Sequence, residues 1–159
     1  MLCHMTDAAL AYVFWHTSLP GTDSDDYAAG LLRWHAALGA AGAVIASATW
    51  RLPGGAPWLS WTGAVYEDWY LVADWTALGR LETDAVSARL LPDHDAAASR
   101  AADGVAGVWR GTAQLPGDEL TWTDTAPTGD VGVWRRCLTL GPAPQYAVAA
   151  AGGPPRQML

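Results

Sequence analysis

The sequence of 159 residues contains no lysine and no asparagine, and only one isoleucine and one phenylalanine. Its nine basic residues are therefore all arginines, and 16 acidic residues leave a net charge of −7. The abundance of alanine, glycine, arginine and tryptophan, which have GC-rich codons, indicates a GC-rich bacterial genome. Nucleic-acid binding needs a basic surface, and Arg135-Arg136 is the only adjacent basic pair, so we expect no nucleic-acid partner.

Cysteines and long apolar runs are also scarce. Cys3 and Cys137 are far apart and lack CxxC spacing, so neither a disulfide framework nor a zinc site is predicted. The first ten residues lack the basic and apolar regions of a signal peptide. No run approaches the ~20 apolar residues that cross a membrane. We therefore predict a cytoplasmic protein that makes no contact with a membrane.

The hydrophobic content is high enough for a substantial core. With 51% hydrophobic and 16% charged residues, the chain is too apolar to be intrinsically disordered. A length of 159 residues fits one domain. We expect a single domain over 1–159, with a core at 8–113, a C-terminal extension at 114–151 and a loose tail at 152–159.

Apolar periodicity, helix caps and breakers predict the order of the secondary structure. The predicted strands are 8–17, 43–52, 58–73 and 105–113, with further strands at 131–140 and 145–150 in the extension. The predicted helices are 25–40, a second from Asp74 to the break before Pro92, and a third from Pro92 to about Gly104. The core therefore has the order β-α-β-β-α-β, which is typical of an α+β, ferredoxin-like fold.

Two of the predicted strands are apolar on both faces. In 8–17, Tyr12, Phe14 and His16 alternate with Val13 and Trp15, and the heart of 58–73 has the same character. A strand that is apolar on both faces belongs to a sheet that is covered on both faces.

The element order, these strands and the run YEDWYLVADWTALGRLETDAVSARLLPDHDAAASR together resemble the dimeric α+β-barrel superfamily, over roughly 8–113. The resemblance implies a ferredoxin-like protomer with an antiparallel sheet and helices on its outer face. It also implies a homodimer in which two sheets pack face to face into a barrel. Members include cofactor-free monooxygenases, isomerases, haem-binding enzymes and proteins without known activity. Where a member has a pocket, it usually lies between the sheet and its helices.

Histidines are the clearest candidates for chemistry, because the chain has no phosphate-binding loop, nucleophile elbow or HExxH motif. His16 ends the first strand, and His35 lies on the inner stripe of the first helix, so both can reach one pocket. We therefore take His16 and His35 as the candidate catalytic residues. A histidine on an apolar stripe is more often a core residue, so that interpretation stays open. His94 is expected at a surface helix start, and His4 is set aside.

Adjacent carboxylates form the second candidate group. Glu67 and Asp68 lie in an apolar strand, so alternation sends them to opposite faces. A buried carboxylate must be paired or have a raised pKa, and perturbed carboxylates often mark functional sites. The structural alternative is an ion pair with an arginine such as Arg51 or Arg110.

The leading hypothesis is a homodimer with a small apolar pocket that binds or transforms a small organic molecule. The candidate substrate-binding residues are Tyr27, Trp34, Trp50, Tyr66, Glu67 and Asp68. Oxygenation without a cofactor or isomerisation are the natural reactions, and no metal or cofactor is expected. One alternative is a non-catalytic dimeric module whose aromatic residues serve only the core and interface. A second is haem binding through His16, His35 or His94.

Overall fold

The computed structural model describes residues 8–129 and 132–159 and has an α+β fold. Cys3, His4 and Val131, the first residue of one predicted strand, lie outside the described residues. The strands are β1 (Ala8–Ser18), β2 (Ala46–Leu52), β3 (Val65–Val72), β4 (Ala101–Thr112), β5 (Thr121–Thr123), β6 (Val133–Leu140), β7 (Tyr146–Val148) and β8 (Gln157–Met158). The helices are α1 (Ser24–Ala41), α2 (Trp75–Ala85) and α3 (Leu91–Ala98).

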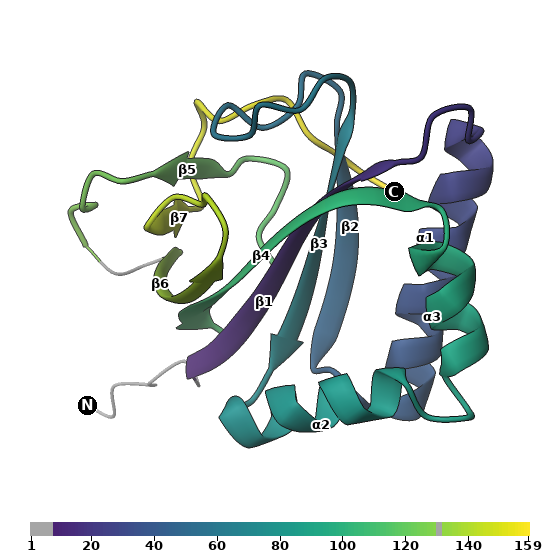
Figure 1. Cartoon of the computed structure of the whole chain (residues 1–159). Helices are drawn as coiled ribbons and strands as arrows, with labels where there is room; N and C mark the ends of the chain where they lie inside the picture. The colour runs from purple at the N-terminus through teal and green to yellow at the C-terminus, as the bar shows by residue number, and fades with distance from the viewer. Residues whose placement is uncertain (1–7, 130–131) are drawn as a thin grey trace.

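The strands form one antiparallel sheet in the order β5-β7-β6-β4-β1-β3-β2-β8. The sheet curls into a half-barrel, and the three helices lie beside it on one side, with α2 across one end (Figure 1). The extension after β4 curls over on the other side as β5, β6 and β7 (Figure 1). The C-terminal segment therefore adds strands at both edges of the central strands β4-β1-β3-β2.

Helix α1 begins and ends where the sequence provides caps. The Asp23 carboxylate accepts hydrogen bonds from the backbone N–H groups of Asp25 and Asp26, each at 3.0 Å. Gly42 ends the helix in the left-handed conformation, with φ of 66°, which glycine adopts without strain. These caps fix the helix that carries Tyr27, Trp34 and His35 against the sheet.

Each face of the sheet has its own core, as the two-sided strands predict. The core on the helix side includes Leu10, Tyr27, Leu31, Trp34, Leu38, Tyr66 and Tyr70. The core on the opposite side includes Trp15, Trp50, Trp69, Trp109, Trp122 and Trp134. Trp122 and Trp134 come from β5 and β6, so the C-terminal extension itself covers the second face.

Several predicted element boundaries are wrong. The third helix ends at Ala98 instead of near Gly104, because β4 begins at Ala101 and pairs with the end of β1. Asp103, with φ of 44°, is the extra residue of a bulge in this early part of β4, opposite the step from His16 to Thr17 in β1. Residues 58–64 precede β3 as loop, and the short strands β5 and β8 were not predicted.

Two side-chain placements also differ from expectation. The apolar periodicity of the second predicted helix puts Trp75, Leu78, Leu81 and Ala85 on its inner stripe, but Trp75 is 47% exposed. The tail predicted to be loose is anchored: Arg156 is buried, and Gln157 and Met158 pair with β2. The tail is anchored because Arg156 pairs with the buried carboxylate of Glu67 and β8 pairs with the open edge of β2. Neither partner can be recognised from the local sequence of the tail.

No helix within the described ranges is long and apolar enough to cross a membrane.

Candidate functional site

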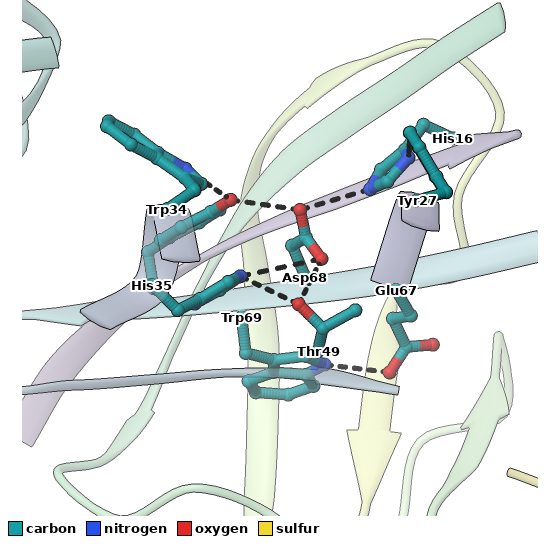
Figure 2. A network of polar contacts seen from close by, with 9 residues as sticks. His16, Tyr27, Trp34, His35, Thr49, Glu67, Asp68 and Trp69 are labelled. Atoms are coloured by element: carbon teal, nitrogen blue, oxygen red, sulfur yellow. Dashed lines mark hydrogen bonds and ion pairs between the residues drawn. The ribbon is translucent and has the colours of Figure 1, made fainter. Parts of the chain in front are cut away.

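Asp68, in the middle of β3, is the centre of a buried polar network on the helix side of the sheet (Figure 2). Its Oδ2 accepts hydrogen bonds from the Tyr70 hydroxyl at 2.9 Å and lies 3.0 Å from Nε2 of His16. Its Oδ1 accepts a hydrogen bond from the Thr49 hydroxyl at 2.7 Å. Both carboxylate oxygens are therefore satisfied, as burial of a charge requires.

His16 connects Asp68 to helix α1. Its Nδ1 lies 2.7 Å from the hydroxyl of Tyr27, so a continuous chain runs from Tyr27 through His16 to Asp68. In a neutral His16 the Nε2–H donates to Asp68, and Nδ1 accepts the Tyr27 proton. The ring is also stacked between neighbours, because it lies nearly parallel to Phe14 at 4.9 Å and to Tyr66 at 5.7 Å. Packing and hydrogen bonds together fix the orientation of this imidazole.

His35 is linked to the same carboxylate through the Thr49 hydroxyl. Because the Thr49 hydroxyl gives its proton to Asp68, its oxygen must accept from His35 Nε2, which lies 2.7 Å away. The His35 Nε2 is itself 3.6 Å from Asp68 Oδ1. Nδ1 of His35 is buried and has no hydrogen-bond partner among the described residues. The two histidines were predicted to reach one pocket, and what they share in the structure is the Asp68 carboxylate.

The third arm of the network, through Tyr70, ties α1 to β3. The Trp34 indole N–H donates to the Tyr70 hydroxyl at 3.2 Å, and that hydroxyl donates to Asp68. The ring of Tyr70 stacks on the ring of His35 at 4.9 Å, with an angle of only 3° between the planes. Residues of β1, β2, β3 and α1 thus all converge on one carboxylate.

The network shifts the pKa of Asp68 and of the tyrosines in opposite directions. Burial by itself raises the pKa of Asp68, but its hydrogen bonds to His16 and His35 and their positive charge when protonated outweigh burial, and the pKa is well below the usual value. Burial first, and then the charge of Asp68, raise the pKa of Tyr27 and of Tyr70. At neutral pH the site therefore holds an ionised aspartate beside tyrosines that keep their protons.

A cavity of about 740 Å³ lies between this network and the helices. Tyr27, His16, Asp68 and Tyr70 form its polar wall, and Trp34 and Leu31 of α1 lie beside them. The rest of the lining is mostly apolar and comes from β1, α2, α3, β4 and β6. A volume of this order fits a small organic ligand.

The predicted site residues divide between the two faces of the sheet. His16, Tyr27, Trp34 and Asp68 line the cavity, and His35 supports Asp68 without lining it. Tyr66 lines a smaller polar depression next to Arg51. His94, expected at the surface, also lines the cavity, with its ring 5.4 Å from Trp34.

Glu67 and Trp50, also predicted to bind substrate, lie on the opposite face. The Glu67 carboxylate accepts hydrogen bonds from the indole N–H groups of Trp15, Trp69 and Trp122, at 2.7 to 3.0 Å. Its ion-pair partner is Arg156, at 3.1 Å, in place of the expected Arg51 or Arg110. The Arg156 guanidinium also lies over the Trp50 ring, 4.2 Å from its centre. This is a structural cluster that attaches the C-terminal tail to the core.

Thr49 and Arg156 were missed as partners of the two carboxylates. Thr49 is an ordinary strand residue by composition, and only the register of β2 with β3 places it opposite Asp68. Arg156 stands between proline and glutamine in a segment without periodicity. Alternation along β3 did predict that Glu67 and Asp68 face opposite ways, and this is confirmed.

The described residues contain no group of three or more histidine, cysteine, aspartate or glutamate side chains that could hold a metal ion. The polar network is instead suited to moving or holding protons, since it joins a tyrosine, a histidine and a carboxylate in one chain.

No protein-family model, curated protein or solved structure matches the chain.

Proposed function

We propose that the protein binds a small, mostly apolar organic molecule in the helix-side cavity and catalyses a proton transfer on it, such as an isomerisation. The observation that carries this proposal is the chain Tyr27–His16–Asp68, whose three members all line the cavity. A proton-transfer group held by a hydrogen bond to a third, buried group is the arrangement that acid–base catalysis needs.

In this mechanism His16 is the acid–base residue. The proton passes between the ligand and Nδ1 of His16. When no ligand is bound, the Tyr27 hydroxyl is the hydrogen-bonding partner of Nδ1. Asp68 stabilises the imidazolium that forms, because it stays ionised and lies 3.0 Å from Nε2. Tyr27 keeps its own proton, since its pKa is raised, and so it acts as a hydrogen-bonding partner of His16 instead of a nucleophile. Such an isomerisation needs no oxidant, whereas oxygenation would need dioxygen.

His35 has a positioning role in this proposal. It does not line the cavity, and it reaches Asp68 by way of the Thr49 hydroxyl. Its contact holds the carboxylate in the orientation that serves His16.

We further propose that β1 to β4 with their helices form the ferredoxin-like protomer of the superfamily that the sequence resembles. The strand order β4-β1-β3-β2 and the helices between β1 and β2 and between β3 and β4 support this. The homodimer stays a prediction. In that superfamily the sheets pair through the face opposite the helices, but here Trp122 and Trp134 of the extension already pack on that face. A dimer of this protein would then use another surface, and sedimentation velocity tests whether it forms.

The cavity favours ligand binding over a purely structural module, whose aromatic residues would close the interior. Haem is a weaker candidate, because both nitrogens of His16 are engaged by Tyr27 and Asp68. His94 is the cavity histidine that iron could reach, since its Nδ1 bonds Asp95 and its other nitrogen has no partner among the described residues. A haem titration without a Soret shift would remove this candidate.

The binding step is tested with tetralin, a bicyclic hydrocarbon, by titration calorimetry. Ala85, on α2, lines the cavity, whereas the exposed Ala88 does not. We expect Ala85→Trp to fill the cavity and weaken tetralin binding at least ten-fold, and Ala88→Trp to leave it unchanged. No binding to the wild type, or equal loss in both variants, would contradict a ligand site here.

A further inference from the structure

The cavity has one hydroxyl that the polar network does not use. Tyr12 of β1 lines the cavity beside Tyr70, with 5.8 Å between their ring centres. Within residues 8–129 and 132–159, no group hydrogen-bonds the Tyr12 hydroxyl. Burial, the charge of Asp68 and the charge of Glu82 all raise its pKa, so the hydroxyl keeps its proton at neutral pH. Tyr12 is therefore a free hydrogen-bond donor facing the ligand space.

The other buried polar groups of the wall are already engaged. Tyr27 bonds His16, Trp34 bonds Tyr70, and Tyr70 bonds Asp68. A ligand that offers a hydrogen-bond acceptor to the interior of the cavity thus meets Tyr12 without breaking a bond of the network. Polar groups are few and well placed in small-molecule sites, and one such donor selects the position of a ligand oxygen.

The charges of the lining disfavour an anion. Among the described residues, no arginine lines the cavity, whereas the acidic residues Asp68 and Glu82 both line it. The two lining histidines are already paired, His16 with Asp68 and His94 with Asp95, so a carboxylate moved from water into this site finds no unpaired cationic partner, which is costly. A cation gains little in compensation, because both oxygens of Asp68 are already engaged and the exposed Glu82 is screened by solvent.

The open side of the cavity is apolar. Four of its lining residues are large hydrophobic side chains that are nonetheless exposed, and these are Trp75, Val86, Leu138 and Leu140. They come from α2, the segment after it, and β6. Exposed apolar groups gathered at one place usually mark a binding surface. The apolar part of a ligand would cover them.

We propose that the natural ligand is a neutral carbonyl compound whose oxygen accepts a hydrogen bond from Tyr12 and whose hydrocarbon body lies toward Trp75, Val86 and Leu138. This inference rests on the proposed function and specifies its substrate class. The carbonyl oxygen on Tyr12 makes the neighbouring C–H bonds more acidic, and His16 lies on the same face of β1 to accept the proton. The proton moves from carbon to Nδ1, where it displaces the Tyr27 hydroxyl, and the C–H electron pair moves through the carbonyl to the oxygen held by Tyr12. The resulting enolate takes a proton back at oxygen, which gives the enol and restores neutral His16.

Four compounds with one bicyclic skeleton test the substrate class by titration calorimetry at pH 7. They are α-tetralone, a neutral ketone; tetralin, which has no acceptor; tetralin carboxylate, an anion; and aminotetralin, a cation. We expect α-tetralone to bind about five-fold more tightly than tetralin, the gain of one neutral hydrogen bond. The carboxylate and the amine should bind at least ten-fold more weakly than the ketone. Tyr12→Phe should lower the affinity for α-tetralone to that for tetralin and should leave the affinity for tetralin unchanged.

Tyr146→Phe is the matched control, because Tyr146 is a tyrosine of β7 outside the cavity. It should leave all four affinities unchanged. If the four compounds bind but the anion or the cation binds best, or Tyr12→Phe weakens tetralin and α-tetralone equally, the substrate class is wrong and the proposed pocket function stands. If none of the four binds, both are wrong.

Discussion

Glu67 and Asp68 are adjacent in β3, and their carboxylates are buried on opposite faces of the same sheet. Glu67 is bonded by three indole N–H groups and Arg156. Asp68 is bonded by two hydroxyls and His16 (Figure 2). The first set of partners holds the C-terminal tail to the core, and the second set faces a cavity. One step along a strand therefore separates a structural carboxylate from a candidate catalytic one.

Asp68→Asn should destabilise the fold by about 3 kcal/mol, because it removes the charge that faces two buried histidines. Asp95→Asn is the control, since Asp95 pairs with His94 on the surface and its side chain is 63% exposed. An exposed pair of this kind contributes well under about 1 kcal/mol. Urea unfolding of both variants measures the difference, and equal losses would contradict the central role of Asp68.

The stability that Asp68 provides should depend on pH in the acid range. Its pKa in the folded protein is below the unfolded value of 3.8, so the contribution is complete above that value and is lost as the pH falls. The difference in unfolding free energy between wild type and Asp68→Asn should therefore be largest at about pH 6 and shrink below about pH 4. A difference that stays constant from pH 6 to the lowest pH at which both fold would be the opposite result.

Glu67 and Arg156 should be strongly coupled. Arg156→Gln leaves Glu67 charged and buried without its cation, and Glu67→Gln leaves the buried guanidinium unpaired and replaces one acceptor oxygen by a donor. We expect each change to cost about 3 kcal/mol and the double variant to cost clearly less than the sum. Additive losses in the double-mutant cycle would mean that the tail is held by its strand pairing alone.

Thr49→Val tests the arm that joins His35 to Asp68. The two side chains have similar shapes, so the change removes the hydroxyl bridge and leaves the His35 Nε2–H unpaired. We expect a loss of about 1–3 kcal/mol in thermal or urea unfolding. Thr83→Val, at an exposed position on α2, should change stability by less than about 0.5 kcal/mol. A tolerated Thr49→Val would show that His35 does not depend on this bridge.

Strand patterning predicted more of the site than motifs did. The apolar residues on both faces of 8–17 predicted a sheet covered on both sides, and alternation separated Glu67 from Asp68. The stripe of α1 placed Trp34 and His35 on the buried side. These features were predictable because each depends only on the period of one element.

The remaining features depend on contacts between distant segments. Thr49 meets Asp68 through strand register, and Arg156 crosses from the end of the chain to β3. The second face was expected to be buried by a partner protomer, but the chain covers it with Trp122 and Trp134 of its own extension. Trp50 and Glu67 were assigned to the pocket because aromatic and acidic residues on either face look alike in sequence. Tyr66 is on the helix side but lines the smaller depression beside Arg51.

The most direct measurement of the central claim is hydrogen–deuterium exchange at the carbon beside the carbonyl of α-tetralone. The ketone is incubated with the protein in heavy water, and proton NMR follows the loss of that signal. The account predicts that the wild type raises the exchange rate well above the rate in buffer. His16→Gln should still bind the ketone, but its acceleration of exchange should be at least ten-fold smaller than that of the wild type. Ala88→Trp should exchange at the wild-type rate. Exchange at the buffer rate with the wild type, or equal acceleration by His16→Gln, would contradict His16 as the proton-transfer residue.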